Sequence, residues 1–362
     1  MKKLIMPICF AVLLSALSGC GGNKNPNTTQ TPAPATPSMT AVPSATPSAG
    51  NTVSDYFPIL ENVQYIYQGE GNEYAGYDVF IDYTDDTKIQ QRLNNGGTVV
   101  SRVIAVTDEQ AVCVYRREES YFRENHLNKT DGIQDVLLMA PIEAGASWVL
   151  EDGLKRTITD VSAEVETPSG TYSAVAVETE YDGGKTTWYY AKGVGLVKTV
   201  SSGEEGYEVL SVLSEIRKET PFVQTVRFYY PNAQDGKIYY KDKELGFKTN
   251  EITRLSLEEA YRTDVPDTLH PVLTENTKIN SLYLNDDGSV YLDLSGEFLT
   301  EMNAGSGLEA MILQCVANTF GSYYGTDGII LTVDGSPYTS GHISLTKGEL
   351  LSVNTEGAAE IP

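Results

Sequence analysis

The chain has 362 residues and a strongly acidic composition, with 26 Lys and Arg against 49 Asp and Glu and a formal net charge of −23. A surface of this sign repels nucleic acid and anionic lipid headgroups, and the sequence holds no basic stripe, so we expect no nucleic-acid partner. The four cysteines include no Cys-x-x-Cys pair, which leaves a thiol-redox role and a zinc knuckle without support.

The first 20 residues have the order of an export signal, in which Lys2 and Lys3 precede an apolar run over 4–14. The Leu-Ser-Gly-Cys sequence at 17–20 resembles the lipobox of bacterial lipoproteins, whose cysteine receives a diacylglyceryl group before cleavage. The resemblance implies that Cys20 is lipidated and anchors the chain at the extracytoplasmic face of the cell membrane. An ordinary secretory signal with a chance cysteine is the alternative. Two or more acyl chains anchor stably, and no later apolar run approaches the ~20 residues of a membrane span.

Residues 21–52 are predicted to form a disordered linker. They hold six prolines among Thr, Ser, Ala and Asn residues, and such a segment has too little apolar surface to fold. Thirty extended residues of this kind reach roughly 90 Å. We interpret the linker as a spacer between the lipid and the folded part, with a passive tether of no particular length as the alternative.

Residues 53–218 are predicted to form an all-β antiparallel domain, because runs rich in β-branched and aromatic residues alternate with turn signals. The strand candidates are 77–83, 98–104, 111–115, 156–161, 173–179 and 187–190. Strands this closely spaced favour an antiparallel sheet, a sandwich or a half-barrel. Segments 56–67 and 167–198 resemble extracytoplasmic β-domains of bacterial lipoproteins, a resemblance that implies no chemistry. The domain is interpreted as a spacer or a second binding face.

Residues 221–349 show a mixed α/β pattern, followed by a C-terminal tail at 350–362. The expected strands are 223–230 with its hairpin partner 237–240, 279–284 with its hairpin partner 289–294, then 329–333 and 342–345. Ser-x-x-Glu capping boxes at 256–259 and 306–309 predict two helix starts. The apolar face of the second helix is Leu308, Met311, Ile312, Cys315, Val316 and Phe320.

The same half of the chain resembles the GerMN domain of sporulation and spore-germination lipoproteins. The matching pieces are 228–231, 277–282, 288–295, 305–309 and 331–335. The resemblance implies an α+β chain that ends in a small α/β sandwich, similar to the ring-building domains of envelope machines, which acts by contacting other proteins. It implies no catalytic residues. One departure is the stretch 260–266, which stands where the family has a Leu-Leu-x-Gly-Pro-like sequence.

A search for chemistry finds no catalytic constellation, so we expect no enzyme. His126, His270 and His342 have no zinc-binding spacing, and no Gly-x-Ser-x-Gly elbow accompanies them. The acidic segment 285–288 lacks the alternation of an EF-hand and is interpreted as a turn. We therefore predict no catalytic residue, no metal site and no cofactor, and Cys20 as the only site residue.

Cysteines and paired tyrosines are two further kinds of residue that can have a structural or binding role. Cys113 and Cys315 lie in apolar runs and are interpreted as small buried side chains, with a disulfide between them left as an alternative. In adjacent pairs such as Tyr229-Tyr230, strand alternation predicts one tyrosine in the core and one outside. The outward tyrosines either line a carbohydrate or protein contact or serve as good strand formers.

The sequence thus predicts a membrane-anchored extracytoplasmic lipoprotein. We expect it to act as a protein–protein interaction or scaffold module in cell-envelope, sporulation or germination processes. Its partners would be the membrane, through Cys20, and other envelope proteins or further copies of itself. The alternative is a solute- or carbohydrate-binding surface lipoprotein. A cell-wall hydrolase would need catalytic residues that the sequence does not show.

Overall fold

The computed structural model describes residues 51–361, so Cys20 and the linker up to residue 50 lie outside the described residues. The described residues form one compact unit. The fold is mostly β, with one large antiparallel sheet and two smaller sheets that both contain a parallel strand pair.

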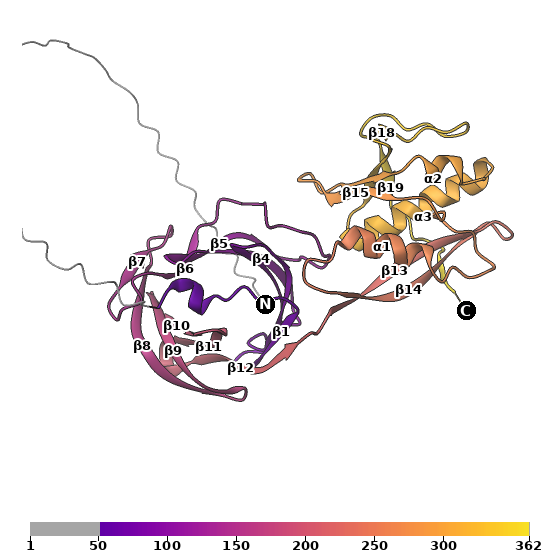
Figure 1. Cartoon of the computed structure of the whole chain (residues 1–362). Coiled ribbons are helices and arrows are strands. Elements are labelled where there is room, and N and C mark those ends of the chain that lie inside the picture. Colours follow the sequence, from indigo (N-terminus) through magenta and orange to yellow (C-terminus); the bar gives the residue numbers. More distant parts are fainter. Residues whose placement is uncertain (1–50, 362) are drawn as a thin grey trace, which may run out of the picture. The chain divides into compact units, whose positions relative to one another are not determined.

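The large sheet contains every strand up to residue 218. Its strands are β1 (Val63–Glu70), β2 (Tyr77–Thr84), β3 (Lys88–Asn94), β4 (Val99–Val106), β5 (Gln110–Arg117), β6 (Asp135–Met139), β7 (Ser147–Val149), β8 (Lys155–Thr167), β9 (Gly170–Tyr181), β10 (Gly184–Ala191), β11 (Gly195–Gly203) and β12 (Glu208–Lys218). Their order is β6-β5-β4-β3-β2-β1-β12-β11-β10-β9-β8-β7. Figure 1 shows this sheet curling into a ring around the short helix η1 (Val53–Tyr56), drawn in indigo.

Side chains rather than a strand ladder close the ring between its two edges, β6 and β7. The Trp148 Nε1 on β7 donates to the Val136 carbonyl on β6 at 2.9 Å. Arg156 on β8 donates to the same carbonyl at 2.7 Å and to Asp135 Oδ1 at 2.9 Å. These contacts use backbone oxygens that an open sheet edge would leave unpaired.

Successive side chains on each strand point to opposite faces of the sheet, and those on the inner face fill the ring. Inward-facing side chains such as Ile104, Ile158 and Leu213 are at most 1% exposed and form one apolar core. The six predicted strands are confirmed. The predicted strand set omitted the other six strands of the sheet, which are β1, β3, β6, β7, β11 and β12. In β3, the Lys-Ile-Gln-Gln-Arg-Leu-Asn sequence carries too many polar side chains to be recognised as a strand.

The rest of the described chain forms two smaller sheets around helices. Its elements are β13 (Phe222–Asn232), β14 (Lys237–Phe247), α1 (Thr253–Arg262), β15 (Ile279–Leu284), β16 (Val290–Leu294), α2 (Glu297–Thr300), α3 (Ser306–Tyr324), β17 (Gly328–Val333), β18 (Ser336–Pro337), β19 (Leu350–Ser352) and β20 (Ala359–Glu360). The strand order is β13-β14-β20 in one sheet and β15-β16-β17-β18 in the other, where β19 also pairs with β17. Phe228, Tyr261 and Phe320, all 0% exposed, join β13, α1 and α3 in one core.

Both predicted capping boxes are wrong in detail. Helix α1 begins at Thr253, three residues before Ser256, and its N-cap is Ile252. Helix α3 begins at Ser306, but its N-cap is Gly305 and no side chain caps it. The acid of the second box, Glu309, is 2% exposed and accepts a hydrogen bond from the Tyr338 hydroxyl, whereas the side chain of Glu259, the acid of the first box, is 70% exposed. At Glu309 a tertiary contact thus replaced the local hydrogen bond that the sequence pattern implied.

The C-terminal residues also differ from expectation. The predicted strand over 342–345 is reduced to a single bridge between Thr339 and Ser344. Residues 350–361, taken from the sequence to be a tail, instead supply β19 and β20, which pair with β17 and β14. The hairpins 279–294 and 222–247 are confirmed. β20 pairs with β14 through only two residue pairs, so it covers only a short part of the β14 edge.

The structure also tests the expectations for the cysteines and the paired tyrosines. Cys113 and Cys315 are both buried and free, as small apolar side chains would be. Tyr229 and Tyr230 are 3% and 0% exposed, so the expectation that one of them faces outward is wrong. Tyr230 packs edge-on against Tyr261 of α1, while Tyr229 packs against Tyr240 of β14. The strand is therefore covered on both faces.

Candidate functional site: a groove beside helix α1

The histidines considered as candidate zinc ligands lie in different environments. His126 is 1% exposed and His342 lies on the surface, in separate parts of the fold. In the described part of the chain, no three His, Cys, Asp or Glu side chains are placed to hold a metal ion. None of the helices within residues 51–361 is long and apolar enough to cross a membrane.

A surface groove of about 530 Å³ runs between α1 and β14. Its floor contains Leu245, Ile252 and Leu255, of which Ile252 and Leu255 are 50% and 44% exposed. The helix turns Leu257 and Tyr261 into the core, both at 0% exposure. Leu255 falls on the opposite side of the helix, because Leu257 and Tyr261, four residues apart, share the buried face. Ile252 is the N-cap of α1 and lines the groove beside Leu255.

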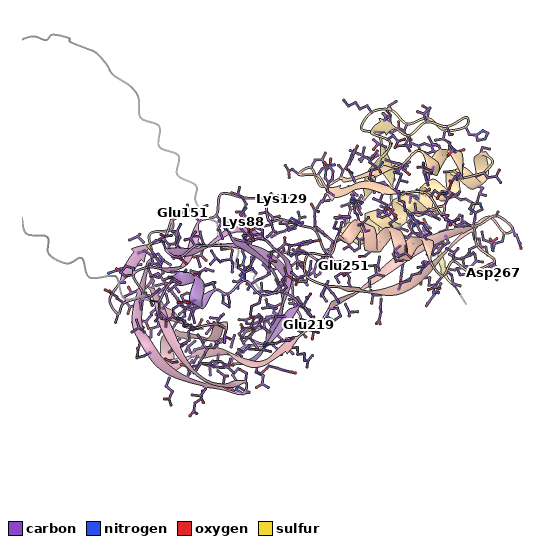
Figure 2. The ribbon with its side chains drawn as sticks, viewed as in Figure 1. Lys88, Lys129, Glu151, Glu219, Glu251 and Asp267 are labelled. Atoms are coloured by element: carbon purple, nitrogen blue, oxygen red, sulfur yellow. The ribbon has the colours of Figure 1, made fainter. Side chains whose placement is uncertain are left out.

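Carboxylates border this apolar floor. Glu244, Glu251 and Glu259 line the groove, and Figure 2 shows Glu251 just before α1. The Glu259 side chain is 70% exposed and forms a loose ion pair with Arg262 Nη1 at 3.8 Å. Glu251 accepts a hydrogen bond from the Lys248 backbone N–H at 2.9 Å. An apolar floor with an acidic border favours a partner that carries both apolar and basic side chains.

The nearest lysine does not neutralise the border. Lys243 Nζ donates to the carbonyls of Ala260 and Thr263 at the C-terminal end of α1. Burial, and then the nearby charge of Lys241, lowers the pKa of Lys243 to about 8. Its ammonium group therefore stabilises the end of the helix, where a positive charge is favourable, rather than the groove.

Helix α1 is held by buried polar contacts. The Glu258 carboxylate accepts from the Ile279 backbone N–H at 2.7 Å and from Arg262 at 3.0 Å. Burial raises the pKa of Glu258, but these hydrogen bonds, with one from Lys278, outweigh it and place the pKa below its usual value. The Tyr261 hydroxyl donates to the Tyr229 carbonyl at 2.8 Å. The groove wall is thus anchored at both the helix surface and the core.

The start of α1 is tied to the large sheet by a buried arginine. Arg123, at 0% exposure, donates from Nη1 to the Tyr83 hydroxyl at 2.7 Å and to Thr253 Oγ1 at 2.9 Å. Its Nη2 donates to the carbonyls of Asp82 at 2.7 Å and Lys248 at 3.0 Å. One guanidinium therefore fastens β2 to the segment that leads into α1. Sequence reasoning missed Arg123, and no local pattern around it signals this role.

Comparison with known proteins gives one family match. Residues 227–339 match the model of the family described as "Germane: Sporulation and spore germination". No curated protein matches. This matched segment contains the groove, α1, α3 and the β15-β16-β17 sheet.

Solved structures are similar over parts of the chain. The tandem GerMN domains of the sporulation protein GerM from Bacillus subtilis share 21% identity over 36% of this chain and 46% of theirs, with a TM-score of 0.29. The first GerMN domain alone shares 21% identity over 36% of this chain and 97% of its own, with a TM-score of 0.28. A structure described as a lipoprotein from Parabacteroides distasonis shares 14% identity over 47% of this chain and 100% of its own, with a TM-score of 0.29.

The chain spans about half of the tandem GerM structure that it matches. TM-scores of this size do not establish a common fold, so the assignment rests on the family model. The resemblance to GerMN domains inferred from the sequence is confirmed by that match. The chain carries a Germane domain, of the sporulation and spore germination family, over residues 227–339.

Proposed function

We propose that this protein is a membrane-anchored extracytoplasmic lipoprotein that acts as a protein–protein interaction or scaffold module in cell-envelope, sporulation or germination processes. The observation that carries the proposal is the groove beside α1, where Ile252 and Leu255 are about half exposed inside an acidic border. Apolar side chains held in a groove on a rigid helix are typical of docking sites. The partner is an envelope protein that presents a segment with apolar and basic side chains.

The anchor in this proposal is Cys20. A lipid at this position would hold the folded unit at the membrane through the Pro-rich linker, without a membrane-spanning helix. Cells that express the full chain, grown with a radiolabelled or clickable fatty acid, should label the wild-type protein. Cys20→Ser should abolish the label and release the protein from the membrane fraction. Label that persists in Cys20→Ser would contradict the anchor.

The groove is tested by crosslinking in cells. A tagged, full-length chain is crosslinked in growing and in sporulating cells, and the recovered partners are compared with those of Leu255→Glu. A carboxylate at this position removes the hydrophobic contact with the partner. The substitution should not disturb this chain's own core, because Leu255 is 44% exposed. We expect Leu255→Glu to lose the main crosslinked partner at unchanged protein level.

Val149→Glu is the matched control, since Val149 is 68% exposed and lies on β7 of the large sheet. It should retain every partner of the wild-type chain. Glu259→Lys tests the acidic border and should weaken the same crosslink. The proposal fails if all three variants recover the wild-type partners in wild-type amounts.

A further inference from the structure

The curled sheet encloses a cavity of about 90 Å³. Its walls come from strands on opposite sides of the ring and from the segment after η1. A third of the lining residues are aromatic, namely Phe57, Tyr65, Tyr67, Tyr77, Trp188 and Tyr190, and most of the others are aliphatic. Apolar and aromatic side chains with a few placed polar groups are the usual lining of a small-molecule site.

Arg102 on β4 is the only charged residue in the wall. Its Nε donates to Gln91 Oε1 at 2.9 Å, which leaves both terminal nitrogens for other partners. Within residues 51–361 no carboxylate lies within 4.0 Å of this guanidinium, whereas Arg92 on the neighbouring strand β3 and Arg156 on β8 each have one. A half-buried cation among apolar side chains is unfavourable unless an anion accompanies it.

Tyrosine hydroxyls add further donors to the cavity. Tyr67 donates to the Leu196 carbonyl at 2.8 Å. Those of Tyr65, Tyr77 and Tyr190 have no hydrogen-bond partner among the residues that the structure describes, and they are not sealed from the cavity. Burial raises the pKa of Tyr65 and of Tyr190 to about 12, so both phenols remain protonated donors at neutral pH.

We propose that this cavity binds a small carboxylate, with its oxygens on the Arg102 guanidinium and the Tyr77 or Tyr190 hydroxyl and its apolar end among the aromatic side chains. A guanidinium pairs with a carboxylate through two parallel hydrogen bonds, and phenol donors complete the set. No acidic side chain in the wall competes for the guanidinium. The site is independent of the α1 groove and adds a function to the proposed scaffold role.

The volume restricts the ligand. A cavity of about 90 Å³ corresponds to about three water molecules at ~30 Å³ each, and it is smaller than the ~150 Å³ cavity that accepts benzene. It therefore accepts an acid of about two to four carbons, of the size of acetate or butyrate. The same group can be a free acid or the C-terminal carboxylate of a short peptide, so both are compared in the test.

The test titrates the detergent-solubilised full chain with sodium butyrate and follows tryptophan fluorescence. The chain has two tryptophans, and Trp188 lines the cavity. Butyramide, the neutral isostere, and sodium chloride at the same ionic strength are titrated in parallel. We expect a saturable change with butyrate alone. Butyrate acting at lower concentration than the dipeptide Ala-Ala would assign the free acid, and the reverse order would assign a peptide terminus.

Variants locate the binding. Arg102→Gln removes the charge and should weaken butyrate binding by about tenfold or more, since a hydrogen bond to a charged group contributes about 1.5–3 kcal/mol. Tyr77→Phe removes one hydroxyl, keeps the ring, and should weaken binding about threefold. Arg217→Gln changes an arginine whose side chain is 49% exposed and should bind as the wild type does.

Three results would overturn the proposal. They are equal responses to butyramide and butyrate, undiminished binding by both Arg102→Gln and Tyr77→Phe, and a saturable response to N-acetylglucosamine in place of butyrate. Tyr77→Phe and Tyr190→Phe each remove a single oxygen atom, so undiminished binding by both of these variants keeps the test decisive if Arg102→Gln fails to fold. The crosslinking results on the α1 groove do not depend on any of these outcomes.

Discussion

His126 makes the stability of this protein depend on pH. The ring is 1% exposed, packs 4.9 Å from the Tyr115 ring, and neither of its nitrogens has a hydrogen-bond partner in the described part of the chain. Burial, and then the charges of Lys129, Arg117 and Arg92, lowers the pKa of His126 from 6.5 to about 3. The folded protein therefore holds this imidazole neutral throughout the mildly acidic range.

The size of the effect follows from proton linkage. Above pH 6.5 the ring is neutral in both states, and the full stability is present. As the pH falls below 6.5, only the unfolded state binds the proton, so stability is lost progressively toward pH 3. Between pH 7 and pH 5 the loss is about 2 kcal/mol. Any folded-state pKa of about 4 or below gives nearly the same loss at pH 5.

Urea unfolding at pH 7 and pH 5 measures this loss. His126→Leu replaces the ring by an apolar side chain that cannot bind a proton, so the drop in unfolding free energy between the two pH values should shrink by about 2 kcal/mol relative to wild type. The same substitution at the exposed His342 is the control and should leave the wild-type drop unchanged. If the unfolding free energy of His126→Leu falls between pH 7 and pH 5 by as much as that of the wild type, protonation of His126 on unfolding does not explain the loss of stability in acid.

Two further substitutions test how the fold is held. Arg123→Ala leaves buried acceptors unpaired and should lower the free energy of unfolding by about 3–5 kcal/mol in urea, whereas Arg217→Ala, at an exposed ion pair, should change it by less than about 0.5 kcal/mol. Gly321→Ala should destabilise by about 1–3 kcal/mol despite its better helix propensity, because the new Cβ would lie 2.2 Å from Val353 Cγ2. Gly307→Ala, with open space around its Cβ, should be neutral or stabilising by up to about 1 kcal/mol in the same thermal or urea assay. Equal effects at the two glycines would refute the packing argument, and a small loss for Arg123→Ala would refute the role of the junction.

Local pattern was sufficient where a continuous apolar run, bounded by turn residues, marks an element. The hairpin 279–294 and the strand at 328–333 were both predicted, since apolar runs and a Gly-containing turn mark them. Local pattern failed where a residue's partner lies far away in the chain. Glu309 matched a capping motif, yet it accepts a hydrogen bond from the Tyr338 hydroxyl. Burial in a tertiary network outweighed a hydrogen bond within one turn.

The candidate sites show the same division. The β-rich first half and the likeness to GerMN domains are properties of contiguous segments, so the sequence by itself was enough to predict them, while the export signal and the Pro-rich linker stay predictions. The cavity joins Arg102 of β4 to Trp188 of β10, and the junction joins Arg123 to Asp82 and Thr253. Strand order and ring closure bring these residues together. Only the tertiary structure decides such sites, because each depends on contacts between residues distant in the chain.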